Sequence, residues 1–218
     1  MPSAGPLAND IKALEILCRS VGSVRPALYD SSAIDIPWRD ISKTANTGKL
    51  RIGVLSEDPC FPWHPPVKRT MAHAEEGLKA QGHEIYRIDP SVAQVGNSLA
   101  LAFAYFFLDS TAMEFIAQSG EELVASVKQS MGEFHAFKSN FLDDIAHLEG
   151  VVRVAALNTK REAIREGWRR VWKEQKLDVV IGPPAQHSAV PHDTYGLPPY
   201  TLMLNVLDVS GSISSIFF

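Results

Sequence analysis

The sequence predicts an α/β fold in which helices cover a mixed, mainly parallel sheet. Residues 50–55 form a short apolar run, residues 67–78 repeat apolar side chains at helical spacing, and residues 84–88 alternate as a second strand. Strand, helix and strand within about forty residues make a βαβ unit, which normally places its two strands parallel in one sheet. This unit therefore supplies two parallel strands of the predicted sheet.

A third strand is predicted near the end of the chain. Leu177 and the run 179–181 are the apolar, β-branched pattern of a buried strand, and Gly182-Pro183-Pro184 ends it. Two prolines remove backbone donors and cannot continue a central ladder. A polar loop follows, and ligands of open α/β sheets bind outside the carboxyl ends of the strands. This loop is therefore a candidate wall of a binding site, whereas the residue types alone favour a strand followed by a surface loop.

The segment before the sheet predicts one helix and an irregular crossing. Asn9 is a residue type that caps helices, and Gly22 is a typical stop. The apolar stripe between them consists of Ile11, Leu14, Leu17, Cys18 and Val21. Periodicity disappears over residues 23–48, where Trp38 is expected to act as a packing anchor.

Helices are predicted over most of the rest of the chain. Pro66 suits the first position of the helix inside the βαβ unit, where a missing N–H costs nothing. Three further helical regions are expected at 91–119, 121–141 and 147–176, with a short helix at 200–208 and a last apolar strand within 210–218. The buried face of the long region 147–176 is predicted to carry Val152, Ala156, Ile164, Trp168 and Trp172.

Composition excludes several classes of function. The chain has 218 residues, 45% of them hydrophobic and 21% charged, with a net charge of −4, so no basic excess favours nucleic acid. The longest apolar run, residues 99–108, is about half of the ~20 residues that a bilayer-spanning helix needs. The start of the chain lacks the pattern of a signal peptide. Two cysteines provide neither a disulfide framework nor a zinc pattern, which suits the reducing cytoplasm.

Metal and nucleotide cofactors are not expected. His187 and His192 lie five residues apart in a proline-rich loop, without a helical H-E-x-x-H pattern or a CxxC pair. The turn after the first strand, residues 56–66, has no glycine and no P-loop. Neither signal therefore supports a cofactor.

An ordered set of segments resembles the amidase signature family, in its acetamidase-type branch. The quoted stretches are Gly5-Pro6-Leu7-Ala8-Asn9-Asp10, Tyr29-Asp30 with Pro37-Trp38-Arg39, Lys49 to Leu55 with His64-Pro65-Pro66-Val67, Leu78 to Glu84, Gly182-Pro183-Pro184-Ala185 with Val190 to Thr194, Tyr200-Thr201 and Asn205 to Asp208. Their order and spacing agree along nearly the whole chain. The resemblance implies a single, partial amidase-like domain over residues 1–218 with an incomplete amidase-type fold.

The resemblance also implies hydrolysis of carboxamide C–N bonds by a serine nucleophile, a bridging serine and a lysine base. In the family these groups lie upstream of the Gly-Pro-Leu-Ala stretch, so we expect no catalytic residue in this chain. Gly22-Ser23-Val24-Arg25 imitates the nucleophile segment but lacks the preceding glycines and serines. Ser212 lies in a serine-rich segment that aligns with an apolar strand. Neither serine has a lysine in the context that the chemistry needs.

The loop after the third strand matches the family's substrate-side segment. The resemblance therefore implies that the substrate contacts come from His192, Asp193, Thr194 and Tyr195. A simpler role for Asp193 is to cap a turn with its carboxylate, as aspartate beside proline and threonine commonly does. The implied partner is a small-molecule amide.

Three interpretations stay open. The chain is a catalytically incomplete amidase, as a gene fragment or a pseudoenzyme; or it is a non-catalytic binding module that retains the substrate-side half of the fold; or it is an unrelated α/β domain. Parallel strands around Val54 and Ile85, with 179–181 in the same sheet, would exclude the third. A sheet with open edges and uncovered apolar surface also predicts self-association into a homo-oligomer or aggregates.

Overall fold

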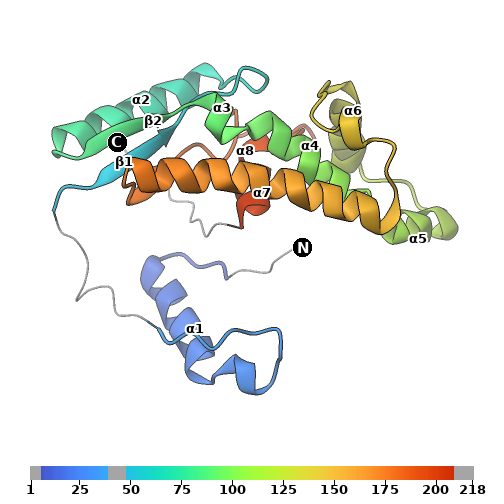
Figure 1. Cartoon of the computed structure of the whole chain (residues 1–218), viewed down its shortest axis with the longest axis horizontal. Coiled ribbons are helices and arrows are strands. Elements are labelled where there is room, and N and C mark those ends of the chain that lie inside the picture. The colour runs from blue at the N-terminus through green and yellow to red at the C-terminus, as the bar shows by residue number, and fades with distance from the viewer. Residues whose placement is uncertain (1–5, 39–47, 209–218) are drawn as a thin grey trace. The chain divides into compact units, whose positions relative to one another are not determined.

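The computed structural model describes residues 6–38 and 48–208, which divide into two compact units, residues 1–48 and 49–218 (Figure 1). The described elements are, in order, α1 (Ile11–Ser23), η1 (Pro26–Leu28), β1 (Arg51–Leu55), α2 (Pro65–Ala80), β2 (Glu84–Ile88), α3 (Pro90–Ala93), α4 (Val95–Phe106), α5 (Thr111–Ser119), α6 (Ala125–Ala136), η3 (Asp143–Ile145), α7 (Gly150–Glu174), β3 (Val179–Ile181) and α8 (Pro199–Leu207). The expectation of a single domain over 1–218 stays a prediction.

The first unit consists of α1 and a short 3-10 turn. The cap of α1 is Asp10 and not Asn9, because the Asp10 carboxylate accepts the Ala13 N–H at 2.8 Å, three residues ahead. The helix runs one residue past Gly22. Trp38 is not buried as a packing anchor: it is 48% exposed, with the Arg19 guanidinium 5.2 Å from its ring centroid. Residues 39–47 lie outside the described part of the chain.

The second unit contains the predicted parallel sheet. The strand order is β2-β1-β3, and both neighbours pair with β1 in parallel, with Ile52 opposite Ile85 and Val179. The α/β prediction is confirmed, and the third interpretation above is excluded by its own test. The prediction that 179–181 is a buried strand is only partly right. Within the described residues, β1 is the central strand, and Val179 on β3 is 38% exposed.

Close packing explains why β1 holds the centre. Four of its five residues are buried, and Gly53 lets both neighbouring strands approach. A Cβ atom on Gly53 would lie 3.0 Å from side-chain atoms of both Ile88 and Val180. Asp178 ties the start of the third strand to the first, because its carboxylate accepts the Arg51 N–H at 2.8 Å.

Helices α4, α7 and α8 form the main core beside the sheet. Helix α4 buries Leu99 and Leu101 completely and packs on α7 and α8, and Figure 1 shows α7 running alongside α4. The predicted region 91–119 is broken into three helices because Gln94 has a left-handed backbone (φ 50°) between α3 and α4, and a turn separates α4 from α5.

The predicted buried face of α7 is partly wrong. Ile164 and Trp168 are buried as predicted, as are Leu157 and Val171, whereas Val152 is 61% and Trp172 38% exposed. Trp168 turns inward because its Nε1–H donates to the Ala93 carbonyl oxygen at 3.3 Å, which joins α7 to α3. The helix packs along only part of its length, so its N-terminal valines have no cover from the described residues. The predicted strand within 210–218 lies outside the described part of the chain.

Candidate functional site

A cavity lies at the carboxyl ends of two neighbouring parallel strands. Its volume is about 900 Å³, and its walls come from the turn 58–60 after β1, the segment 90–97 after β2 and the connection 137–143 after α6. Parallel strands direct their following loops to the same edge of the sheet, where open α/β folds bind ligands. A volume near 900 Å³ is within the usual range for small-molecule sites. We call this the polar cavity.

The turn after β1 is held by a buried tyrosine from α8. Tyr200 is 1% exposed; its hydroxyl donates to the Phe61 carbonyl oxygen at 2.8 Å and accepts the Asp58 N–H at 3.1 Å. Burial raises the pKa of Tyr200 to about 12, so the hydroxyl stays a donor at neutral pH. The Asp58 carboxylate in turn accepts the Cys60 N–H at 2.8 Å. These bonds fix the position of Cys60 in the cavity wall.

The segment after β2 begins with a capped turn. The Asp89 carboxylate accepts the Ser91 N–H at 2.8 Å, and hydrogen bonding from Ser91 lowers the pKa of that carboxyl group. Pro90 follows as the first helical residue of α3. The next turn presents Gln94 and Asn97, whose carboxamides are joined by one hydrogen bond of 3.0 Å from Asn97 Nδ2 to Gln94 Oε1.

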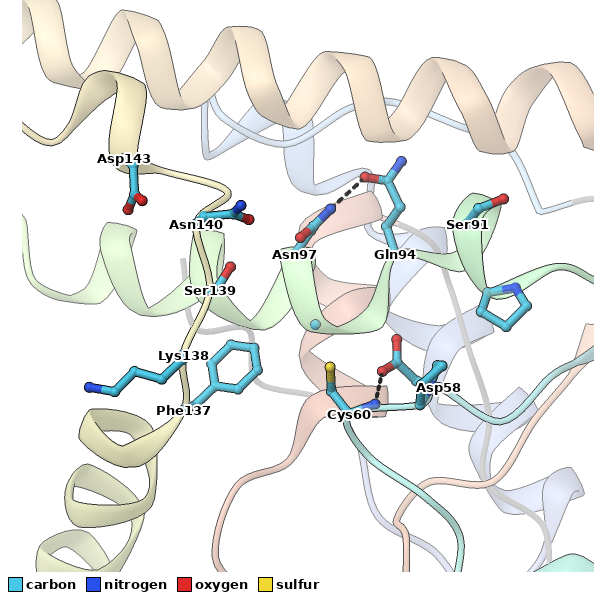
Figure 2. Close-up of a pocket in the computed structure, with 13 residues that line it drawn as sticks. Asp58, Cys60, Ser91, Gln94, Asn97, Phe137, Lys138, Ser139, Asn140 and Asp143 are labelled. Atoms are coloured by element: carbon cyan, nitrogen blue, oxygen red, sulfur yellow. Dashed lines mark hydrogen bonds between the residues drawn. The ribbon is translucent and has the colours of Figure 1, made fainter.

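That bond leaves two atoms available for a ligand. Among the described residues, Asn97 Oδ1 and Gln94 Nε2 have no hydrogen-bond partner. Figure 2 shows the side chains of Ser139 and Asn140 projecting from the opposite connection into the gap next to Asn97. A carboxamide ligand carries one acceptor and two donors, so the paired amides offer it groups of matching type. The cavity can therefore orient a small polar amide.

The four residues predicted to contact substrate lie elsewhere. His192, Asp193, Thr194 and Tyr195 are all exposed, and none lines the polar cavity. The Thr194 hydroxyl donates to the Pro191 carbonyl oxygen at 2.8 Å. Within the described residues the Asp193 carboxylate accepts no hydrogen bond, although its backbone is left-handed (φ 62°). Their role in substrate binding stays a prediction.

This loop is nevertheless joined to the turn after β1. The His64 N–H donates to the Gln186 carbonyl oxygen at 2.8 Å, and the rings of His64 and His187 lie 5.7 Å apart. Tyr195 meets the His187 ring edge-on at 5.1 Å. No group of three or more His, Cys, Asp or Glu in the described residues is arranged to hold a metal ion.

Sequence reasoning missed Gln94, Asn97, Ser139 and Asn140. The first two could have been found by applying the carboxyl-end rule to β2, since they follow that strand within ten residues. The other two have no local signal, because packing between segments far apart in the sequence brings them to the cavity. Phe134 on α6 stacks on Phe103 of α4, with ring centroids 4.0 Å apart.

The serine that imitates a nucleophile has a structural role. Ser23 ends α1, and its hydroxyl donates to the Ser20 carbonyl oxygen at 2.7 Å. Among the described residues, no lysine forms a hydrogen bond with it. Ser212 lies outside the described part of the chain.

The family model described as Amidase matches residues 1–214, which is nearly the whole chain. The chain belongs to the amidase family. An amidase of Gibberella moniliformis is 31% identical to it over 97% of this chain and 38% of its own length. An acetamidase of Emericella nidulans is 27% identical over 98% of this chain and 39% of its own length. The amidase chain thus spans about two fifths of the length of these relatives.

A solved structure of fatty acid amide hydrolase has the same fold over most of this amidase chain. The two agree with a TM-score of 0.74 and 23% identity, over 94% of this chain and 34% of the hydrolase. At this identity the likeness concerns the fold alone. In the described residues, no single helix is long and apolar enough to span a membrane; Pro90–Phe106 and Thr111–Ser119 meet that measure only as a pair bent by 60°.

Proposed function

We propose that these residues form the substrate-side part of an amidase that hydrolyses small carboxamides to the carboxylic acid and ammonia or an amine. The observation that carries the proposal is the amidase family match over residues 1–214. Relatives named amidase and acetamidase support it, since they match along the same span. Water supplies the new C–O bond, and the nitrogen leaves with a proton. The polar cavity would orient the carboxamide.

The 218-residue polypeptide by itself is proposed to be inactive. In the family, the resemblance assigns the nucleophile, bridging serine and lysine base to a segment that these residues do not match. Removing members of such a unit lowers turnover by many orders of magnitude. Ser23 offers no replacement, because its hydroxyl is bonded to the backbone of its own helix.

Ammonia release tests the inactivity. The purified chain is incubated with acetamide and an aryl amide beside Ser23→Ala and Ser212→Ala, with the Emericella acetamidase as the positive control. All three forms should stay at background. Turnover by the wild-type chain that one serine variant abolishes would show that the nucleophile is present after all.

A chimera tests amide hydrolysis itself. The parts of the Gibberella moniliformis amidase that lie outside its matching region are joined to the ends of residues 1–218, and folding is checked by circular dichroism and a cooperative melt. Such a chimera should release ammonia from acetamide. A folded chimera without release would contradict the proposed function.

The proposal also covers the cellular compartment and the binding partners. Both cysteines of the chain are free and exposed, which supports the cytoplasm as the compartment. We expect a small-molecule amide as the partner, with no nucleic acid and no membrane.

Exposed apolar residues of the described helices, among them Phe106 and Phe115, support self-association. Light scattering at several protein concentrations would measure it.

A further inference from the structure

The polar cavity contains one buried acidic side chain. Asp58, in the turn after β1, is 7% exposed and lines the cavity. One oxygen of its carboxylate accepts the Cys60 N–H at 2.8 Å, and Figure 2 shows the other oxygen pointing away from that bond. Within the described residues, this second oxygen accepts no hydrogen bond. A buried carboxylate oxygen without a partner therefore faces the cavity.

The described residues give this carboxylate no counter-ion. Asp58 forms no ion pair among them, and its neighbour in sequence, Glu57, is the residue that pairs with Lys68, at 2.9 Å. Of the described residues that line the cavity, Lys138 is the only basic one, and Figure 2 shows its amino group directed away from Asp58. A buried carboxylate is costly to keep ionised unless a cation or several hydrogen bonds compensate it. A bound cation would supply the missing partner.

The Asp58 carboxylate is held in position before a ligand binds. The Asp58 N–H donates to the Tyr200 hydroxyl at 3.1 Å, and the Asp58 carbonyl oxygen accepts the Phe61 N–H at 3.0 Å. Tyr200 is itself buried on α8. Because the backbone is fixed and one carboxylate oxygen is bonded to Cys60, little conformational entropy is left to lose on binding. The carboxylate is thus preorganised for a cation.

The other polar groups of the cavity suit an ammonium group and a carboxamide together. An ammonium group donates three hydrogen bonds and accepts none. Besides Asp58, the side-chain oxygens of Ser139 and Asn140 line the cavity and can accept from it. Asn97 Oδ1 and Gln94 Nε2, which have no partner among the described residues, match the donors and the acceptor of a carboxamide. The cavity therefore suits a ligand that carries both groups.

We propose that the polar cavity binds a small primary amide that carries a protonated amine, with the Asp58 carboxylate bound to the ammonium group. The carboxamide part rests on the proposed function, whereas the ammonium part rests on the Asp58 carboxylate. The substrate class is then short amides with a positively charged group at the end opposite to the carboxamide. Asp58 selects these amides over neutral ones.

Calorimetric binding to the 218-residue chain tests the ammonium part without turnover. β-Alaninamide and butyramide have the same number of non-hydrogen atoms and differ at one end, where an ammonium group replaces a methyl group. At pH 6.5, where an aliphatic amine keeps its proton, β-alaninamide should bind roughly tenfold more tightly or better, because hydrogen bonds to charged groups are the stronger ones. Equal affinities for the two amides would overturn the proposal.

A third compound tests the carboxamide part. Ethylammonium carries the cation and lacks the carboxamide, so it should bind much more weakly than β-alaninamide. Binding of ethylammonium as tight as that of β-alaninamide would contradict the carboxamide contact. A chimera that hydrolyses acetamide, in a chain without preference for β-alaninamide, would keep the hydrolytic function and remove the ammonium site. A folded but inactive chimera, in a chain with that preference, would do the reverse.

Two matched substitutions test the assignment to Asp58. Asp58→Asn keeps an acceptor for the Cys60 N–H and removes the charge, so the affinity for β-alaninamide should fall to that for butyramide. Asp143→Asn removes the same charge from an exposed residue of the same cavity, and it should keep most of the preference. A preference that Asp143→Asn abolishes and Asp58→Asn leaves intact would contradict the assignment.

The stability of Asp58→Asn is a second readout. Without ligand, its melting temperature should equal or exceed that of the wild type, because the substitution removes a buried charge that has no counter-ion. β-Alaninamide should raise the melting temperature of the wild type and not that of the variant. A clearly lower melting temperature of the ligand-free variant would show that the carboxylate already has a partner within the chain, and it would contradict the proposal.

Cysteine protection provides a test that needs no variant. Cys60 lines the polar cavity, whereas Cys18 is an exposed residue of α1 and serves as the internal reference. Saturating β-alaninamide should slow the alkylation of Cys60 severalfold, measured by peptide mass spectrometry, and leave Cys18 unchanged. Equal rates for Cys60 with and without β-alaninamide would overturn the proposal even if Asp58→Asn failed to fold.

Discussion

Tyr200→Phe removes one oxygen atom from the core of the second unit and keeps the ring. The Tyr200 hydroxyl makes two hydrogen bonds to the backbone of the turn after β1, one with the Asp58 N–H and one with the Phe61 carbonyl. Phenylalanine leaves both backbone groups without that partner. An unsatisfied buried group costs about 1–3 kcal/mol, so we expect the free energy of unfolding to fall by roughly 2–3 kcal/mol.

The pKa of Tyr200 predicts how stability depends on pH. Burial is the main cause of its rise from 10.0 to about 12, and this corresponds to about 3 kcal/mol between the two protonation states. A raised pKa means that the folded state holds its proton more tightly than the unfolded state. The contribution to stability is therefore complete below pH 10 and is lost as the pH rises toward 12.

Urea unfolding measures both effects. Wild type and Tyr200→Phe are compared at pH 7, 9 and 11, and the stability difference between them should shrink between pH 9 and 11 as the wild type loses this contribution. A phenol absorbance titration should show one tyrosine fewer in the late phase of the variant. A variant whose free energy of unfolding lies within 0.5 kcal/mol of wild type at pH 7 would refute the role assigned to this hydroxyl. A wild-type phenol titration without a late phase would refute it as well.

Two further substitutions test the sheet and its cover. Gly53→Ala should destabilise the chain by about 1–3 kcal/mol in urea unfolding, because its Cβ would press on Ile88 and Val180; an unchanged midpoint would contradict the close packing of β1. Glu75→Gln should cost about 1–2 kcal/mol at pH 7, because the buried carboxylate is bonded to Lys79 and Arg87. Hydrogen bonding from Lys79 lowers the pKa of Glu75, so this contribution is present above pH 4.5 and is lost as the pH falls below it; a difference that persists at pH 3 would contradict this assignment.

Local sequence patterns determined the elements of the βαβ unit. The alternation in 84–88 matches β2 at both ends, and the apolar run 50–55 contains β1. These segments are short and bounded by turns, so little besides their own pattern decides where they begin and end. Prolines are equally informative: α2 begins at Pro65, one residue before the expected Pro66, because either proline fits the first turn.

Local patterns predicted less well which face of a helix is buried, because the packing partners decide that. A helix of 25 residues carries apolar side chains on several faces, and only its packing decides which are covered. Trp168 is buried where α7 packs on α3, and it donates a hydrogen bond to the Ala93 carbonyl oxygen there. Val152 lies four turns earlier on α7 and is exposed. The order of the strands is likewise a property of three segments together. An apolar run such as 179–181 has the same pattern at the centre of a sheet and at its edge.

The candidate site, too, was predicted from the sequence only in part. The family and the rule that ligands bind at the carboxyl ends of strands could both be read from the chain, yet the predicted loop was the one after β3. The described cavity follows β1 and β2 instead, and its far wall, residues 137–143, comes from a connection about forty residues beyond α3. Periodicity and residue type report on neighbours in sequence. Tertiary contacts such as the stacking of Phe134 on Phe103 and the packing of Phe137 on Phe61 bring Asn140 and Asn97 to the same cavity, and these contacts are a property of the folded chain.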